Sequence, residues 1–119
     1  MLSNILKSKL HHATVTESEL EYEGSLGIDE QLMDDVKMVS YEKILVANMA
    51  NGERFETYAI PAERGSGTIC LNGATAHKGS VGDRIIIFTF CQLTEDEMLT
   101  HHPLVYVLNE NNKPIGGLR

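Results

Sequence analysis

The chain of 119 residues has the length of a single folded domain, which excludes two domains. Hydrophobic residues make up 42% of it and charged residues 23%, a balance that supports a buried core and excludes a disordered chain. Because 17 acidic residues outnumber 10 basic ones, the net charge of −7 repels phosphate backbones, and we expect no nucleic-acid partner.

The first part of the chain predicts a strand and a helix. Val15 to Gly24 carries spaced apolar residues and ends at a Gly-Ser turn signal, which predicts one strand or two short ones. Asp29 can accept hydrogen bonds from the first-turn amides of a short helix that follows it. The apolar side chains of that helix fall roughly on one face: Leu32, Met33, Val36 and Met38.

The middle of the chain predicts a hairpin. Two apolar-rich runs, Ile44 to Met49 and Phe55 to Ile60, flank the dipeptide Asn51-Gly52. This dipeptide is typical of a type I′ turn, because both of its residues tolerate positive φ. We therefore expect two antiparallel strands joined by that turn.

Two further strands are predicted at Gly67 to Leu71 and Arg84 to Cys91. The continuous run Ile85 to Ile87 predicts burial on both faces of the sheet. The longest apolar run, Ile85 to Phe90, is far shorter than the roughly 20 residues of a membrane span, and the N-terminus lacks the apolar region of a signal peptide. We expect a soluble, cytoplasmic protein with no membrane partner.

The last part of the chain predicts one helical turn and one strand. Thr94 with Glu97 three residues later matches a capping box, and Leu104 to Leu108 predicts a strand. We expect the tail from Asn109 to Arg119 to be poorly ordered. Many short strands with one or two short helices and no strand-helix alternation predict a mainly β barrel or sandwich, which suits an enzyme, a binding module or an assembly subunit.

Potential metal ligands are few. Cys70 and Cys91 each lie in an apolar stretch, so we expect two buried thiols rather than a disulfide. His11-His12 and His101-His102 are adjacent pairs, and adjacent residues of a strand point to opposite faces. Neither pair can then chelate through both rings, and we expect no metal.

Several polar residues have both a functional and a structural interpretation. A basic cluster opens this acidic chain: Lys7, Lys9, His11 and His12. Lys9 and Arg54 could hold a carboxylate between an ammonium and a guanidinium fork, or could be solvated surface charges. Asn72-Gly73-Ala74 is a turn whose amides could bind an anion or only reverse the chain. Tyr22, Thr57 and Tyr58 could serve chemistry or only pack.

Gly24-Ser25 is the most ambiguous dipeptide, because most such pairs are only turns. A serine hydroxyl can, however, attack the preceding carbonyl and convert the amide to an ester when the backbone is strained and a donor stabilises the oxyanion. Glycine before the serine permits the unusual dihedral angles and leaves the carbonyl unshielded.

Five motifs follow one another along the chain: K-x-H at Lys9 and His11, Y-E-G-S at Tyr22 to Ser25, N-G-x-R-F-x-T-Y-A-I at Asn51 to Ile60, N-G-A at Asn72 to Ala74, and V-G-D at Val81 to Asp83. Their order and separations resemble the aspartate 1-decarboxylase family from about Met1 to about Leu108. The ordered set is much more specific than any one of its motifs.

The resemblance implies a double-psi β-barrel that assembles as a homotetramer with active sites at subunit interfaces. It also implies a proenzyme of one domain, residues 1–119, that cleaves itself between Gly24 and Ser25 into residues 1–24 and 25–119. Ser25 then becomes a pyruvoyl group, the cofactor, with no pyridoxal phosphate and no metal. Thr57 matches the family residue that hydrogen-bonds the Gly24 carbonyl oxygen during cleavage.

The implied reaction converts L-aspartate to β-alanine and CO2 for pantothenate and coenzyme A biosynthesis, through a Schiff base with the pyruvoyl ketone. Tyr58 matches the family's proton donor, Lys9 and Arg54 match its carboxylate-binding residues, and His11 matches a residue near the same pocket. Further matches to substrate-binding residues are Thr57, Asn72, Gly73, Ala74 and Thr75. His12, Gly27 and Thr75 depart from the usual family residues, which bears on the rate of cleavage and on substrate affinity.

Two other functions are compatible with the same residues. A non-enzymatic β-barrel module would stay uncut and bind small dicarboxylates at Arg54 and Lys9. A purely structural oligomer would neither bind such ligands nor turn them over.

Overall fold

The computed structural model describes the whole chain, Met1–Arg119. The strands are β1 (Ser3–Thr14), β2 (Glu17–Glu19), β3 (Ser25–Asp29), β4 (Lys43–Asn48), β5 (Arg54–Ala62), β6 (Ile69–Asn72), β7 (Arg84–Leu93) and β8 (Leu104–Val107). The helices are α1 (Glu30–Asp35), the 3-10 helix η1 (Gly73–Lys78) and α2 (Glu95–Met98). This composition confirms a mainly β fold with short helices. None of the helices has the length and apolar character that a membrane crossing requires.

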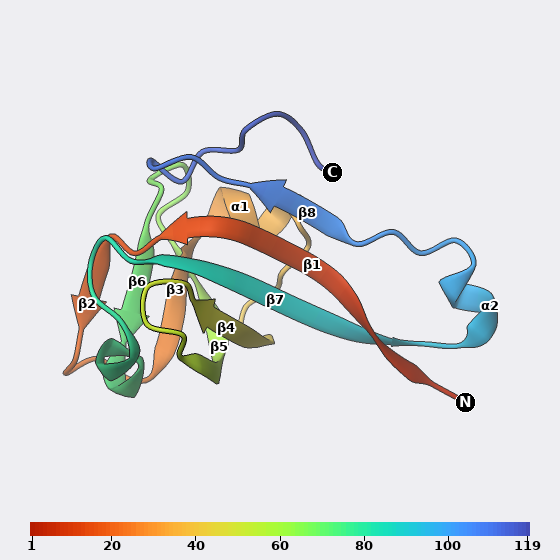
Figure 1. The fold of residues 1–119 in the computed structure, drawn as a ribbon, viewed down its shortest axis with the longest axis horizontal. Helices are drawn as coiled ribbons and strands as arrows, with labels where there is room; N and C mark the ends of the chain where they lie inside the picture. The colour runs from red at the N-terminus through yellow and green to blue at the C-terminus, as the bar shows by residue number, and fades with distance from the viewer.

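The strands form one sheet that closes on itself. Their order is β2-β6-β3-β5-β4-β7-β1-β8, and β1 and β2 are consecutive in the chain. Between them the Val15 amide donates to Asp83 and the Thr16 amide donates to Ile69, so this stretch bonds first the start of β7 and then β6. The strand order thus starts from and comes back to one stretch of chain. This closes the sheet into a barrel and covers its strand edges. β8 lies beside β1 (Figure 1).

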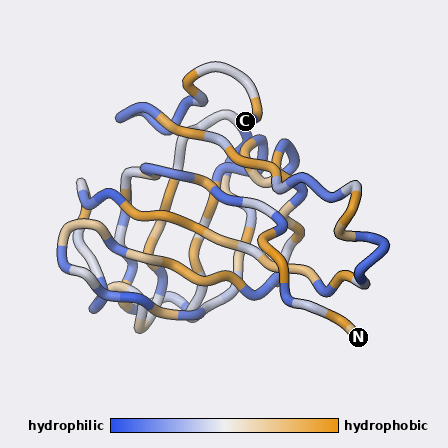
Figure 2. The backbone as a smooth tube through the Cα atoms, turned by 45° about the vertical axis from the view of Figure 1, so that its right-hand side comes forward, coloured by the Kyte–Doolittle hydropathy of each residue, from blue (hydrophilic) through white to orange (hydrophobic).

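A core of 17 buried apolar residues fills the barrel. Strand alternation supplies most of it, as on β7, where Ile85 and Ile87 are fully buried and Ile86 between them is half-buried. The predicted burial of this run on both faces is therefore wrong, because β7 has core on one side only. Figure 2 shows hydrophobic stretches along the strands and hydrophilic ones at many of the turns.

The N-terminal part of the chain differs from the predicted strand pattern. Val15 to Gly24 is strand only at β2, and Leu20 and Tyr22 are exposed in a turn in which the Tyr22 amide donates to Glu19. The apolar residues of this segment lack the strict alternation of a longer strand. The longest strand, β1, instead contains the basic cluster, to which the sequence pattern assigned no element, and β3 was also unassigned.

The predicted hairpin forms, because β4 and β5 pair antiparallel. Its turn is not type I′, since only Gly52 of the Asn51-Gly52 pair has a positive φ, at 76°. The Asn51 side chain instead accepts from the Glu53 amide and donates to the Lys78 carbonyl. These side-chain hydrogen bonds stabilise a longer loop than the dipeptide predicts.

The predicted disorder of Asn109 to Arg119 is also wrong. Asn112 is completely buried, and its side chain bonds the Thr14 amide, the Thr14 carbonyl and the Gly67 carbonyl. The Arg119 amide donates to Val105. Hydrogen bonds to distant segments hold the tail, and no local sequence pattern reports them.

The remaining predictions at element ends are confirmed. Asp29 accepts from the Gln31 amide at the start of α1, and Thr94 and Glu97 form a capping box at α2.

Cys70 and Cys91 are free thiols; Cys70 is buried as predicted, but Cys91 is only half-buried. Cys91 pairs with Ile5 of β1 on the part of β7 that lies beyond its last pair with β4, Phe88 with Leu45.

Candidate active site

Ser25 is the first residue of β3, and its side chain is completely buried. β3 pairs antiparallel with β6, which sets Ser25 opposite Asn72. The Asn72 side-chain amide donates to Ser25 Oγ over 3.0 Å. The pairing of these two strands therefore supplies the hydrogen bond that orients the Ser25 hydroxyl.

Cys70 adds one further hydrogen bond to this contact. Its thiol donates to Asn72 Oδ1 over 3.1 Å, which leaves the Asn72 NH2 group for Ser25. Burial raises the pKa of the Cys70 thiol, and the carboxylates of Glu17 and Glu19 raise it further, so the thiol stays protonated and able to donate. Sequence reasoning missed this role, although the spacing of two residues on a strand places Cys70 and Asn72 on one face.

The backbone at the Gly24-Ser25 bond is unusual. Ser25 has a φ of 157°, in the positive range that residues with a Cβ rarely adopt. Such conformations cost about 1–3 kcal/mol and persist only where the surroundings hold them. Gly24 is exposed, and a Cβ added to it would contact nothing within 4 Å. An accessible glycine therefore precedes a buried, strained and hydrogen-bonded serine.

Gly73 packs against the segment that precedes Ser25. Its φ is 62°, and a Cβ at this position would lie 2.7 Å from the Tyr22 carbonyl oxygen and 2.8 Å from the Gly24 amide nitrogen. Both contacts are to backbone atoms, which a side-chain movement cannot relieve. Only glycine therefore lets the start of η1 approach the Gly24-Ser25 bond so closely.

The rest of the predicted turn also begins η1. Ala74 is exposed, whereas Thr75 is buried and its hydroxyl donates to the Asn72 carbonyl over 2.7 Å. The same Thr75 oxygen lies 3.3 Å from the Ser25 carbonyl oxygen. Asn72, Gly73 and Thr75 thus surround Ser25 and the residue before it.

Thr57 and Tyr58 lie on β5, the other neighbour of β3. The two strands run parallel and their pairing begins with Leu26 opposite Ala59, so Thr57 and Tyr58 precede the paired part of β5 as Gly24 and Ser25 precede that of β3. Both side chains are half-buried. No hydrogen bond joins either side chain to Gly24 or Ser25, whose side-chain partners are Asn72 and Thr75.

Lys9 and Arg54 both approach Phe88 on the solvent side of the sheet. We call the side of β5, β4, β7 and β1 that points away from the core the outer face. On it, Lys9 lies opposite Phe88, and Phe88 lies opposite Leu45 on β4. Lys9 Nζ is 5.8 Å and Arg54 Cζ is 5.9 Å from the centre of the Phe88 ring. Both cations thus lie against one aromatic ring, on a face where each can bind an anion.

His11 and His12 occupy an irregular stretch of β1, where the pairing with β7 slips between Leu10 and Ala13. His12 has a φ of 66°, and the two rings stack with centres 3.9 Å apart. The prediction that these rings point to opposite faces is therefore wrong, because the bulge breaks strand alternation. Burial lowers the pKa of His11, as do the neighbouring His12 and Lys9, and its buried Nδ1 has no hydrogen-bond partner. No three metal-ligating side chains come together in the chain.

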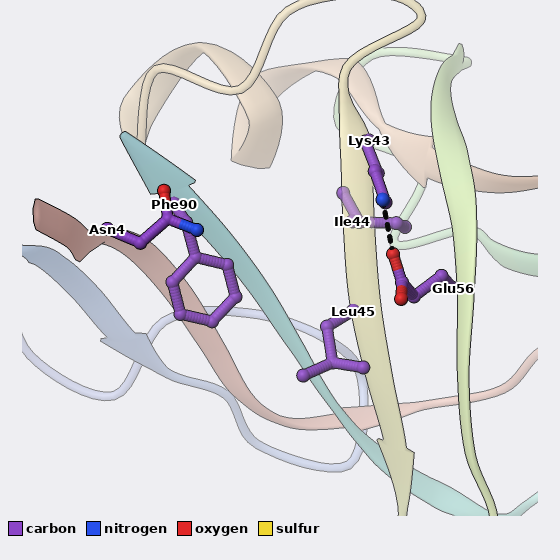
Figure 3. Close-up of a pocket in the computed structure, with 6 residues that line it drawn as sticks. All are labelled: Asn4, Lys43, Ile44, Leu45, Glu56 and Phe90. Atoms are coloured by element: carbon purple, nitrogen blue, oxygen red, sulfur yellow. Dashed lines mark ion pairs between the residues drawn. The ribbon is translucent and has the colours of Figure 1, made fainter. Parts of the chain in front are cut away.

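A hollow of about 430 Å³ adjoins the outer face where β4 separates from β7. Phe90 and Leu45 line it, and an ion pair of 2.6 Å between Lys43 Nζ and Glu56 Oε2 forms part of its wall (Figure 3). Ser25 is not among its lining residues. The hollow thus extends the outer face rather than enclosing the serine.

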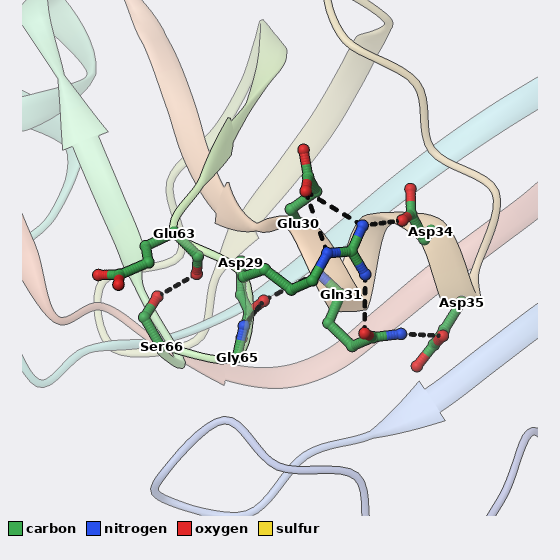
Figure 4. A network of polar contacts seen from close by, with 9 residues as sticks. Asp29, Glu30, Gln31, Asp34, Asp35, Glu63, Gly65 and Ser66 are labelled. Carbon is green, nitrogen blue, oxygen red and sulfur yellow. Dashed lines mark hydrogen bonds and ion pairs between the residues drawn. The ribbon is translucent and has the colours of Figure 1, made fainter.

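The far end of β3 is fixed by Asp29, whose buried carboxylate accepts from the backbone amides of Gln31, Gly65 and Gly67. Burial alone would raise the pKa of Asp29, but these three donors, together with the charge of Lys113, outweigh it and lower the pKa. Figure 4 shows this contact beside the ion pairs that Arg64, after β5, makes with α1. The strand that begins at Ser25 is therefore anchored at both ends.

The predicted site residues fall into two groups in a single chain. One group surrounds the Gly24-Ser25 bond, and the other, with Lys9, His11 and Arg54, lies on the outer face. Lys9 is on β1, which β5, β4 and β7 separate from β3, whereas Arg54 begins β5, the neighbour of β3; no hydrogen bond or ion pair joins Ser25 to either cation. A single chain thus presents both groups at different places on the barrel.

Comparison with known proteins gives one consistent family. A family model described as aspartate decarboxylase matches residues 1–115. The aspartate 1-decarboxylase of Caldicellulosiruptor saccharolyticus is 55% identical over 95% of this chain and 88% of its own length. That of Staphylococcus epidermidis is 53% identical over 97% and 90%, and that of Ralstonia pickettii 52% identical over 95% and 94%. The chain therefore belongs to the aspartate decarboxylase family.

Proposed function

We propose that this protein is an aspartate 1-decarboxylase that converts L-aspartate to β-alanine and CO2 and is made as a proenzyme. The assignment of the activity rests on family membership over residues 1–115. The observation that carries the maturation step is the buried Ser25 hydroxyl, hydrogen-bonded by Asn72 in a backbone with φ of 157°. Because its product is β-alanine, we assign the enzyme to pantothenate biosynthesis in the cytoplasm.

Self-cleavage begins when Ser25 Oγ attacks the Gly24 carbonyl carbon. The peptide C–N bond breaks as the ester forms, and the Ser25 nitrogen takes up the proton. Loss of the Ser25 Cα proton then expels the Gly24 carboxylate and leaves dehydroalanine, which water hydrolyses to a pyruvoyl group and ammonia. Thr57, which precedes the part of β5 that pairs with β3, is the donor we assign to the oxyanion of the first step.

The residues around position 25 fit a pyruvoyl group. Asn72 donates a hydrogen bond to the Ser25 hydroxyl oxygen, and the Thr75 hydroxyl donates to the Ser25 carbonyl oxygen. Gly73 leaves open the space that a Cβ would fill. The pyruvoyl ketone supplies an electron sink for the electron pair that is freed as CO2 departs. The chain's own residues must therefore bind aspartate, orient it and return a proton.

Lys9 and Arg54 are assigned to the side-chain carboxylate of aspartate. Tight binding of the departing carboxylate would stabilise the ground state more than the transition state. The two cations therefore favour decarboxylation more when they bind the side-chain carboxylate, which stays on the product. Tyr58, on the strand next to β3, is assigned to donate the proton that replaces CO2 on the substrate carbon.

The separation of Ser25 from the cations supports an active site shared between subunits. Because three strands lie between β3 and β1, the strand that carries Lys9, a second copy can bring its outer face to the Ser25 side of the first. The half-buried Leu45, Ile86 and Phe88 give that face an apolar centre that suits a contact between subunits. The homotetramer with active sites at subunit interfaces is the arrangement we propose.

Intact mass spectrometry under denaturing conditions tests the proposal. The purified protein should give a peptide ending at Gly24 and a large chain whose mass fits a pyruvoyl group in place of Ser25. It should release CO2 from L-aspartate, and Ser25→Ala should stay uncut and inactive. A chain that stays whole on long incubation and heating, binds dicarboxylates and releases no CO2 would instead be a binding module.

A further inference from the structure

Phe88 is the one aromatic residue that contacts both outer-face cations. Lys9 Nζ and Arg54 Cζ lie 5.8 Å and 5.9 Å from its ring centre, within the range of attraction between a cation and a π-system. The five motifs that indicate the family do not include this position, and no substrate contact is assigned to it above.

Strand geometry explains why such a contact matters. Lys9 is on β1 and Arg54 is on β5, with β7 and β4 between them. At about 4.8 Å per strand, the backbones of β1 and β5 are about 14 Å apart. The two oxygens of one carboxylate can contact both cations only if the two side chains lean toward each other across the intervening strands.

Two effects oppose that convergence. The cations repel each other, and lysine and arginine have the largest rotamer freedom to lose on being fixed. The Phe88 ring lies on β7 between them and attracts both through its negative face. An aliphatic side chain at this position has no such face.

We propose that Phe88 is a positioning residue for substrate binding: its ring holds Lys9 and Arg54 converged over β7 and β4, so that together they bind one carboxylate. This inference rests on the proposed function, because it concerns the site assigned to the side chain of aspartate. It deepens that function by naming what arranges the two cations.

The test compares Phe88→Ile with Phe88→Tyr in the processed enzyme. Loss of two cation contacts should raise KM for aspartate about tenfold, equal to about 1.4 kcal/mol, while kcat stays within about twofold. The dissociation constant of succinate, a dicarboxylate that cannot be decarboxylated, should rise by the same factor in calorimetry. Phe88→Tyr keeps an aromatic face and should restore both values.

Phe90→Leu is the matched control, since its ring lies 6.4 Å from that of Phe88 and contacts neither cation. It should leave KM and succinate binding within about twofold. Phe88→Leu repeats the test if the isoleucine variant does not fold. The inference is overturned if the aliphatic variants keep wild-type KM and succinate affinity, if only kcat falls, or if Phe88→Tyr fails to restore binding.

Failure of the proposed function gives a different result. A wild-type protein that never releases CO2 refutes the decarboxylase assignment whatever the Phe88 variants do. Succinate calorimetry still measures the effect of the ring on carboxylate binding in that case. The two failures are therefore distinguishable.

Discussion

Gly73→Ala tests the close packing of η1 against the segment before Ser25. The new Cβ would lie 2.7, 2.8 and 2.9 Å from three backbone atoms of Tyr22 and Gly24, and alanine would have to adopt a φ of 62°. The φ alone costs about 1 kcal/mol, and overpacking of this kind adds about 1–3 kcal/mol. We expect the variant to lose about 3 kcal/mol of unfolding free energy.

Gly52→Ala is the matched control. Gly52 has a similar φ of 76°, but a Cβ there would contact nothing within 4 Å. It should lose only the conformational term of about 1 kcal/mol. The difference of about 2 kcal/mol between the two variants isolates the steric contact with the cleavage segment.

Urea unfolding at one fixed protein concentration measures this difference. Both substitutions are made together with Ser25→Ala, so that every chain stays uncut and the comparison involves one covalent species. With a slope of about 2 kcal/mol per molar urea, the Gly73 variant should unfold at a midpoint about 1 M below that of the Gly52 variant. Equal midpoints would refute the packing argument and leave the positive φ as the reason for a glycine at this position.

Three further predictions follow from the site. Arg54→Lys keeps the charge but loses the guanidinium fork, so KM for aspartate should rise about tenfold in a CO2-release assay, and an unchanged KM would remove Arg54 from the site. Cys70→Ser keeps a donor to Asn72 and should cleave at nearly the normal rate, whereas Cys70→Ala should slow cleavage, followed by mass spectrometry, about fivefold; equal rates would contradict the hydrogen-bond role. Asp29→Asn turns an NH2 group toward backbone donors and should cost about 2 kcal/mol in urea unfolding at neutral pH.

The Asp29 prediction also has a defined pH dependence. The folded-state pKa of Asp29 lies below its unfolded value, so its contribution to stability is present above the unfolded pKa and is lost as the pH falls through the folded one. Wild-type stability should therefore fall more steeply in acid than that of Asp29→Asn. Parallel curves for the two proteins would contradict the assigned contacts.

Local sequence patterns gave the elements that depend on local physics. The hairpin strands, the helix capped by Asp29 and the capping box at Thr94 each rest on hydrogen bonds or alternation within a few residues, and all three are present. The turn at Asn51-Gly52 was predicted as the wrong type, because the Asn51 side chain bonds Lys78, a residue far along the chain.

The unpredicted features share a long-range origin. β1 and the ordered tail depend on partners far along the chain, as when Asn112 bonds Thr14 and Gly67. The stacking of His11 on His12 depends on a bulge against β7, which a one-strand pattern cannot reveal. Cys70 looked like a core thiol because its polar partner becomes visible only when β6 is placed beside β3.

The sequence by itself determined the family, the chemical groups available and the Gly24-Ser25 bond as the candidate cleavage point, since these depend on residue identity and order. Only the tertiary structure decided which groups meet. It set Asn72 against Ser25, gathered Lys9 and Arg54 over Phe88, and kept these two groups on different parts of the barrel. The reason is physical: strand pairing brings together residues that are far apart in the chain, and the register that decides their contacts is fixed by burial of the whole core.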